Sequence, residues 1–323
     1  MKAIRIDTHG GPEVMRLADV ETPAPRAHEV RVRNHACGVN FIDTYHRDGL
    51  YKMPMPSGLG QEGAGVVEAI GDGVTRFRIG DRIVYCSGPI GAYAEAHVVR
   101  EDRAVHLPDA ISFDVGAASL LKGMTARYLL RKTFPVQHGQ SVLIHAAAGG
   151  VGQILTQWAV HLGAMVIATV GNDAKAEIAR SLGAQHVLIL GRDDVAKRVR
   201  EITNGEGVPV VYDGVGKDTW DASLDSLRVR GTMVSFGNAS GAVPPFSPLV
   251  LSQKGSLFLT RPTLGHYTAT ATELDETADD LFAVIEQGAV KIAPPTRYAL
   301  ADAAQAHRDL EGRKTTGSLV LIP

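Results

Sequence analysis

The chain has 323 residues, of which 45% are hydrophobic and 21% charged, with a formal net charge of −2. Its length predicts two domains of roughly 150 residues each, and its small charge argues against binding to nucleic acid or to an anionic membrane. No apolar run approaches the roughly 18 residues that span a bilayer, no signal peptide is expected, and two cysteines indicate a cytoplasmic rather than a disulfide-stabilised secreted protein.

Residues 1–122 predict a domain of short antiparallel strands. Polar and apolar residues alternate over 29–33, as expected for a strand with one buried face. Further strands are expected over 64–70, 81–85 and 92–99. Glycine and proline clusters separate these segments, which is typical of a barrel-like antiparallel fold. A helix expected over 113–130 connects this domain to the next.

The segment 141–152, S-V-L-I-H-A-A-A-G-G-V-G, predicts a strand, a tight turn and the start of a helix. Backbone N–H groups and the helix dipole at such a turn attract a dinucleotide pyrophosphate, and small residues let it approach. Because alanine replaces the first glycine of the G-x-G-x-x-G pattern, an ordinary packing turn is the alternative. The candidate cofactor contacts are Ala148, Gly149, Gly150, Val151 and Gly152.

After this turn, apolar strands and helices alternate regularly. Strands are expected over 165–170, 186–190, 208–213, 231–236 and 256–260, and helices over 174–182, 193–203 and 218–227. Continuous apolar strands separated by helices form a parallel sheet covered on both faces. Together with the strand before the glycines, they predict an α/β domain with a doubly wound, six-stranded parallel sheet.

The end of the chain predicts a return to the first domain. A helix is expected over 273–287 and a final strand over 317–322. The dinucleotide-binding domain is therefore expected as an insertion over 123–261. The substrate domain is then discontinuous and comprises 1–122 and 262–323.

Motifs along the whole chain carry a family resemblance. They lie at 11–14 (GPEV), 36–45 (ACGVNFIDTY), 58–65 (GLGQEGAG), 80–84 (GDRIV), 121–126 (LKGMTA), 147–152 (AAGGVG) and 234–238 (VSFGN). In this order they resemble the medium-chain dehydrogenase/reductase superfamily, and most of all its zinc-independent quinone oxidoreductase (zeta-crystallin-type) branch. The resemblance implies a GroES-like β-barrel-type substrate domain and an inserted Rossmann domain.

The same resemblance bears on metal binding. In zinc-dependent relatives, the position matching Asn40 is a cysteine ligand and the position matching Gln61 is a histidine. Amides are poor zinc ligands beside thiolate and imidazole, and Cys37 lies too early in the chain to replace the cysteine. We therefore expect no catalytic metal. Without a Lewis acid, the expected hydride acceptor is a quinone, or a conjugated enone or enal, because these spread the added charge.

In the family, the segment 40–51 lies at the nicotinamide, so its candidate catalytic residues are Asn40, Asp43, Tyr45 and Tyr51. Asn40 is a candidate for holding the carboxamide or the substrate oxygen, and either tyrosine for contacting the acceptor. The structural alternatives are an Asx-turn at Asp43 and packed surface aromatics at the tyrosines. None of these residues has the signature of an essential general acid.

The end of the second strand of the nucleotide domain favours NADPH over NADH. An NAD enzyme places an acid there for the ribose hydroxyl, whereas this chain has Gly171 and Asn172, followed by the cation Lys175. Two residues argue the other way. Asp173 is close enough to bind a ribose, and relatives often carry a tyrosine at the position of Leu190, a loss for which Arg192 is a candidate replacement.

The resemblance adds further cofactor contacts at Thr125, Phe236, Gly237, Asn238 and Arg313. Helix capping and ordinary surface charge are their structural alternatives. The apolar edge strand near Leu257 predicts pairing across a two-fold axis, and hence a homodimer.

Two other functions stay open beside NADPH-dependent quinone reduction. The same fold suits reduction of the double bond of enals, enones or enoyl thioesters with NADPH. It also suits a non-catalytic NADPH-binding protein, although the chain has no basic stripe interleaved with aromatics for RNA.

Overall fold

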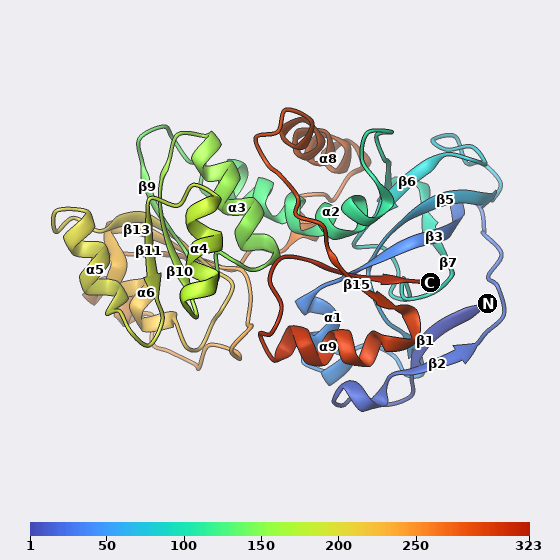
Figure 1. Cartoon of the computed structure of the whole chain (residues 1–323), viewed down its shortest axis with the longest axis horizontal. Helices are drawn as coiled ribbons and strands as arrows, with labels where there is room; N and C mark the ends of the chain where they lie inside the picture. The colour runs from blue at the N-terminus through green and yellow to red at the C-terminus, as the bar shows by residue number, and fades with distance from the viewer. The chain divides into compact units, whose positions relative to one another are not determined.

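The computed structural model describes all residues from Met1 to Pro323, and the chain divides into two compact units (Figure 1). Unit 1 comprises Met1–Met124, Thr268–Glu286 and Ile292–Pro323, and unit 2 comprises Thr125–Tyr267 and Gln287–Lys291. Unit 1 is thus assembled from stretches that lie far apart along the chain. None of the helices combines the length and hydrophobicity that crossing a bilayer requires.

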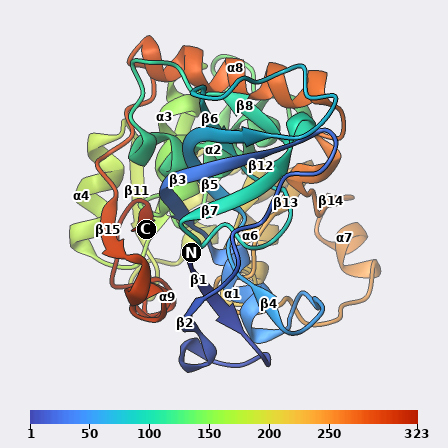
Figure 2. The same cartoon turned by 90° about the vertical axis from the view of Figure 1, so that its right-hand side faces the viewer.

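Unit 1 contains two sheets. The smaller has the order β2-β1-β4, with β1 Lys2–Ile6, β2 Arg16–Asp19 and β4 Ser57–Gly58. The larger has the order β15-β16-β3-β5-β6-β8, and β7 also pairs with β3 (Figure 2). Its strands are β3 Glu29–Val39, β5 Glu62–Ile70, β6 Arg82–Tyr85, β7 Ala96–Arg100, β8 Ala104–His106, β15 Thr296–Ala299 and β16 Leu319–Ile322.

The long strand β3 shows why alternation predicted an antiparallel domain. Val30 and Val32 are fully buried in a core that also contains residues of β5, β6 and β7, whereas Arg33 is exposed on the other face. β3 pairs antiparallel with β5, β7 and β16. Leu319 of β16 lies opposite Val39, which confirms that the final strand returns to the first part of the chain.

Several expected elements of unit 1 differ in their bounds; the strand expected over 29–33, for example, extends to Val39. The strand expected over 92–99 begins only at Ala96, because Tyr93 O accepts from Ile4 N of β1 at 2.8 Å instead. The helix expected over 113–130 ends as α2 at Tyr128, and a π-helical turn, Leu129–Thr133, follows. The other helices of unit 1 are α1 Phe41–Asp48, α8 Ala271–Glu286 and α9 Ala303–Glu311.

Unit 2 is a six-stranded parallel sheet with the order β11-β10-β9-β12-β13-β14. Its strands are β9 Ser141–Ile144, β10 Met165–Val170, β11 His186–Ile189, β12 Val208–Asp213, β13 Leu227–Ser235 and β14 Phe258–Thr260. The intervening helices are α3 Gly150–His161, α4 Asp173–Ser181, α5 Val195–Ile202, α6 Trp220–Ser226 and α7 Leu249–Gln253. The predicted α/β class and doubly wound sheet are confirmed.

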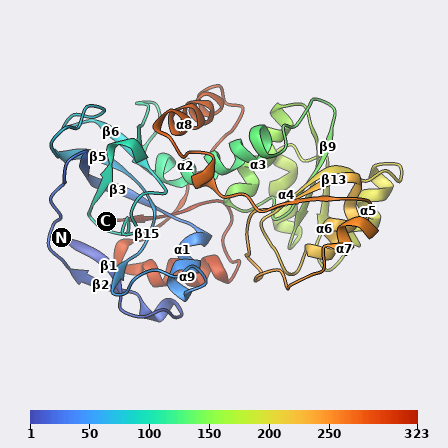
Figure 3. The same ribbon diagram turned by 180° about the vertical axis from the view of Figure 1, so that it is seen from behind.

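The sheet of unit 2 is buried because helices cover both of its faces. In Figures 1 and 3, α3 and α4 lie on one side, and α5 and α6 on the other. One core lies between the sheet and the helices α5 and α6, where Leu143 and Val211 of the sheet pack with Val199 and Leu224. β9 pairs with both β10 and β12, so the strand order reverses at β9. Ligands of open α/β sheets bind beyond the carboxyl ends of the strands at this switch point.

Candidate functional site

The glycine turn between β9 and α3 leaves no room for a side chain at Gly152. A Cβ on Gly152 would lie 2.2 Å from Ala146 O and 2.8 Å from Ala147 Cα, both backbone atoms. The turn tightens at Ala146, whose φ is +52°, and Gly149 N donates to Ala146 O at 2.9 Å. No side chain caps the start of α3, and its first turn contains no acid. The turn therefore presents helix N–H groups to an anion.

A buried polar network joins the strand ends beneath this turn. Ser223 Oγ and Thr219 Oγ1 donate to Asp213 Oδ2 at 2.8 and 2.7 Å. Ser223 Oγ also lies 2.9 Å from His145 Nε2, and His145 Nδ1 lies 2.8 Å from Thr169 Oγ1. Because the serine hydroxyl donates to Asp213, it accepts from His145, which fixes the tautomer of the imidazole. Burial lowers the pKa of His145, whereas Asp213 opposes the shift.

The loops after β12 and β13 pack on each other. A Cβ on Gly237 would lie 2.4 Å from Gly214 O, and Ala239 N donates to that oxygen at 3.2 Å. Phe236 N donates to Asp213 O at 2.8 Å. Of the predicted cofactor contacts, Phe236, Gly237 and Asn238 thus lie at the carboxyl end of β13, beside the loop of β12.

The end of β10 carries the predicted phosphate contacts. Asn172 caps α4, because its Oδ1 accepts from Lys175 N at 2.9 Å. Gly171 is exposed, and a Cβ there would meet no atom within 4 Å. Asp173 accepts hydrogen bonds from both terminal guanidinium nitrogens of Arg192, at 2.8 and 2.7 Å. These bonds lower the pKa of the Asp173 carboxyl group. Arg192 therefore neutralises the one acid that argued against NADPH.

In unit 1, the predicted residue Asn40 contacts a buried ion pair. Its Nδ2 donates to Glu62 Oε2 at 2.8 Å, and Glu62 Oε1 accepts from Leu121 N at 2.7 Å. Lys122 Nζ lies 3.7 Å from Glu62 Oε2 and donates to Val39 O at 3.3 Å. Burial raises the pKa of Glu62, although Lys122 and Asn40 oppose the shift.

Asp43 is fully buried and lies in a directional hydrogen-bond chain. Its Oδ2 accepts from Asn40 N and from Tyr93 Oη, both at 2.8 Å, whereas its Oδ1 has no partner. His307 Nε2 lies 3.1 Å from Tyr93 Oη, and His307 Nδ1 accepts from Arg47 at 3.0 Å. Since Nδ1 accepts, Nε2 carries the proton and donates to Tyr93. Burial raises the pKa of Asp43 to about 7 and lowers that of His307 to about 3.

Asp43→Asn is expected to flatten the pH dependence of unfolding. Because the pKa of Asp43 is about 7 in the folded chain and its ordinary value is 3.8, the folded state holds this proton more tightly. The stability that the protonated carboxyl contributes is complete below its ordinary pKa and is lost as the pH rises to about 7.

Urea unfolding at pH about 5 and about 7.5 measures this difference. The decrease in the free energy of unfolding should be larger in the parent protein than in the variant. Asp7→Asn, which alters an exposed ion pair with Arg16, is the matched control. Equal slopes in parent and Asp43→Asn proteins would show that Asp43 does not titrate in this range.

The predicted tyrosines belong to an aromatic group on and after α1. Tyr45 is 9% and Tyr51 37% exposed, and their rings meet edge to face at 5.4 Å. The ring of His46 contacts Tyr51 at 5.8 Å. Tyr51 is thus the more accessible of the two tyrosines for a flat ligand.

The remaining predicted contacts are Thr125 and Arg313. Thr125 is buried within α2, in unit 2. Arg313 is exposed just after α9, in unit 1, and has a φ of +55°. Neither contact is tested by the structure, and both stay predictions.

Sequence reasoning missed the partners of the predicted residues. Glu62, Lys122, Tyr93 and His307 all contact or continue the group around Asn40 and Asp43. For Lys122, the available signal was its place in the motif at 121–126. His307 offered no such signal, because it meets Tyr93 across 214 residues.

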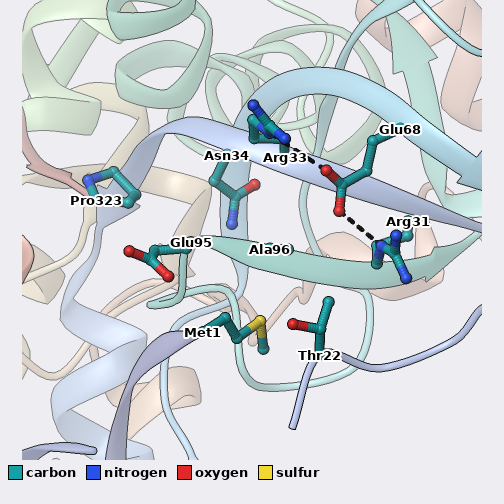
Figure 4. A pocket seen from close by; sticks show the side chains of 9 residues that line it. All are labelled: Met1, Thr22, Arg31, Arg33, Asn34, Glu68, Glu95, Ala96 and Pro323. Atoms are coloured by element: carbon teal, nitrogen blue, oxygen red, sulfur yellow. Dashed lines mark hydrogen bonds and ion pairs between the residues drawn. The ribbon is translucent and has the colours of Figure 1, made fainter. Parts of the chain in front are cut away.

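A pocket elsewhere in unit 1 is unrelated to these residues (Figure 4). Arg31, Arg33 and Glu68 line it, together with both ends of the chain. Glu68 accepts from Arg31 Nε at 2.6 Å and from Arg33 Nε at 3.2 Å. Glu68 therefore pairs with both arginines, and none of the predicted site residues lines the pocket.

Comparisons with known proteins cover the whole chain. Family models described as "Alcohol dehydrogenase GroES-like domain" and "Zinc-binding dehydrogenase" match residues 26–109 and 150–279. A quinone oxidoreductase of Pseudomonas aeruginosa is 54% identical, with 100% of this chain and 99% of that protein covered. A 2-haloacrylate reductase of Burkholderia is 45% identical, with 98% of both chains covered. The crystal structure of Escherichia coli quinone oxidoreductase complexed with NADPH has a TM-score of 0.98 and 49% identity, with both chains fully covered.

Proposed function

This chain belongs to the quinone oxidoreductase branch of the medium-chain dehydrogenase/reductase superfamily, and from that premise we propose that it reduces quinones with NADPH. The observation that carries the proposal is the glycine turn at the switch point of the parallel sheet. At Gly152 a Cβ would fill the space against Ala146 O, so that only backbone lies there. Such a turn fits a pyrophosphate, and the E. coli relative was crystallised with NADPH.

The residues that would hold the cofactor come from the ends of three strands and from two further positions, one in α2 and one after α9. They are Ala148 to Gly152 after β9, Gly171, Asn172 and Lys175 after β10, Phe236, Gly237 and Asn238 after β13, and Thr125 and Arg313. When bound, NADPH supplies the hydride for the acceptor. Residues 123–261 would then be the cofactor domain, and 1–122 with 262–323 the acceptor domain.

In the acceptor domain, Tyr51 would stack on the flat acceptor, with Tyr45 packed behind it at 5.4 Å. Asn40 would orient the acceptor oxygen through an amide that Glu62 holds in place. Orientation of this kind lowers the barrier because the reacting atoms need no further ordering.

The test is NADPH oxidation by purified protein, followed by absorbance with quinones of increasing ring size and repeated with NADH. The expected result is turnover with quinones and a preference for NADPH. Tight NADPH binding without oxidation by any quinone or enone would favour the non-catalytic alternative instead.

A second candidate is reduction of a conjugated carbon–carbon double bond. The 2-haloacrylate reductase at 45% identity is the observation that favours it. The same assay is run with cyclohexenone and haloacrylate as well as with the quinones. A higher kcat/KM for the quinones supports quinone reduction, and a higher kcat/KM for the other acceptors supports double-bond reduction.

Lys175→Ala is expected to raise the Kd for NADPH by about tenfold or more, because a charge-assisted hydrogen bond contributes about 1.5 kcal/mol or more. The Kd for NADH, which lacks the 2′-phosphate, should change little. Titration of the intrinsic fluorescence with each nucleotide measures both constants. Lys197→Ala, an exposed lysine on α5, is the control, and equal losses for both nucleotides would refute the phosphate contact.

We also propose a homodimer through the edge strand β14, which pairs only with β13 in the sheet. Leu257, near which the contact was expected, is buried, but Phe258, Leu249 and Val229 are 61%, 61% and 68% exposed. Phe258→Asp is expected to give a monomer in sedimentation velocity. Ile79→Asp, at a similarly exposed apolar residue of unit 1, should stay dimeric, and a monomeric parent protein would end the proposal.

The chain is also expected to work in the cytoplasm. Cys37 and Cys86 are buried free thiols, and burial raises the pKa of Cys37 to about 12. Free thiols are usual in reducing compartments. Fractionation of the source cells tests this expectation.

A further inference from the structure

Two hydrogen-bond donors converge on one carboxylate oxygen beside the start of α1. Glu62 Oε2 accepts from Asn40 Nδ2 at 2.8 Å and lies 3.7 Å from Lys122 Nζ. The other oxygen of Glu62 is fixed by Leu121 N at 2.7 Å. Glu62 therefore brings an amide and an ammonium to the same carboxylate oxygen.

Both donors keep capacity beyond Glu62. An amide nitrogen carries two N–H groups and an ammonium three. The only other hydrogen bond of Lys122 Nζ in this group runs to Val39 O, at 3.3 Å. The pair thus has further N–H groups around Glu62 Oε2, and Asn40 is the N-cap residue of α1, which carries Tyr45.

The ion pair of Lys122 with Glu62 is long, and Asp43 also interacts electrostatically with the ammonium. Charge-assisted N–H···O bonds are usually about 2.7–2.9 Å long, whereas Lys122 Nζ lies 3.7 Å from its carboxylate partner. The side chain of Lys122 is 7% exposed and that of Glu62 is 0% exposed. A cation in so little water acts strongly on nearby negative charge.

We propose that Lys122 Nζ and Asn40 Nδ2 together bind the acceptor oxygen that becomes negatively charged during reduction. The proposal rests on the proposed function, which supplies NADPH as the reductant. Hydride adds to a carbon of the conjugated acceptor, and the displaced π electrons move to its oxygen. Lys122 stays protonated and stabilises that oxyanion, which then takes a proton from water. Glu62 acts as a positioning residue, because it holds both donors without touching the acceptor.

This role predicts an effect that depends on the acceptor. A weakly electrophilic enone needs the cation more than a strongly electrophilic quinone, since more charge develops on its oxygen before the barrier is crossed. For Lys122→Met we expect kcat/KM with cyclohexenone to fall about 100-fold, the usual effect of removing an oxyanion donor. With para-benzoquinone it should fall less than about fivefold. Lys122→Arg, which keeps the charge, should restore much of the enone activity.

The controls separate charge from folding. Lys197→Met removes an exposed lysine and should change neither acceptor. If Lys122→Met leaves Glu62 unpaired and fails to fold, the double variant Glu62→Gln/Lys122→Met removes both charges, and the same acceptor dependence is expected of it. NADPH affinity, measured by fluorescence, should be unchanged in all variants. An equal loss with quinone and enone would overturn the proposal.

A second readout needs no turnover. The probe is para-nitrophenol, whose phenolate resembles a reduced acceptor and absorbs visible light. Protein with Lys122 should lower the pKa of the bound phenol by about one unit or more, and Lys122→Met should abolish that shift. An identical phenol titration in both proteins would contradict the proposal. The proposed function fails separately if none of the acceptors tested supports NADPH oxidation by the parent protein.

Discussion

Gly152→Ala is expected to lower the free energy of unfolding by about 2–3 kcal/mol, the cost of inserting a methyl group where nothing can yield. The Cβ would lie 2.2 Å from Ala146 O and 2.8 Å from Ala147 Cα. Both are backbone atoms of the turn, so the turn itself has to move. The displaced turn should also bind the pyrophosphate less well. A loss of about 1.4 kcal/mol of binding free energy raises the Kd for NADPH about tenfold.

Urea unfolding and NADPH titration measure the two effects. Gly171→Ala is the matched control, because a Cβ there meets no atom within 4 Å, and its stability should change by less than about 0.5 kcal/mol. Gly149→Ala should lie between them, since its only close neighbour would be Ala146 O at 3.2 Å. A Gly152→Ala protein with the stability and NADPH affinity of the parent would contradict the assigned turn.

Arg47→Ala is expected to lower the free energy of unfolding by about 2–3 kcal/mol, because it removes a buried guanidinium that donates to several partners. The Arg47 side chain is 3% exposed and holds Glu311 through two bonds, at 3.0 and 2.7 Å. It also donates to His307 Nδ1 and to Gly10 O, each at 3.0 Å. Its loss would leave the fully buried His307 Nδ1 without its donor, whereas Glu311, whose side chain is 35% exposed, would be solvated by water.

The exposed pair of Arg16 and Asp7 is the control for this prediction. It is also doubly bonded, with both distances at 3.0 Å, but its side chains are 55% and 56% exposed. Arg16→Ala should therefore cost less than about 1 kcal/mol. If both arginine variants lose the same stability in urea unfolding, burial does not decide the strength of these pairs.

Arg47 is also connected to the candidate site through hydrogen bonds. Arg47, His307 and Tyr93 form a chain of donors that ends on Asp43. Losing the first donor allows the imidazole to change tautomer, after which Tyr93 is no longer forced to donate to Asp43. A shift in the pH dependence of unfolding in Arg47→Ala would reveal this coupling.

Much of the fold could be predicted from local pattern. The alternation in β3, the continuous apolar strands of unit 2 and the glycine turn each report burial or backbone geometry over a few neighbouring residues. Such signals survive in the sequence because the physical cause is local. The π-helical turn after α2 was not predicted: Phe134 N donates to Leu129 O at 3.2 Å, and Tyr212 Oη of the distant β12 lies 3.3 and 3.2 Å from Leu129 O and Phe134 O.

By itself, the sequence determined the two types of sheet, the turn at 147–152 and the candidate residues Asn40, Asp43 and Lys175. Only the tertiary structure decided what surrounds them. In the folded chain, Lys122 and Asn40 both contact Glu62. Asp43 is buried and accepts from Tyr93, and Asp173 forms an ion pair with Arg192. The reason is physical: periodicity records which residues are buried, whereas charge pairing and pKa depend on groups that only folding brings within a few ångströms.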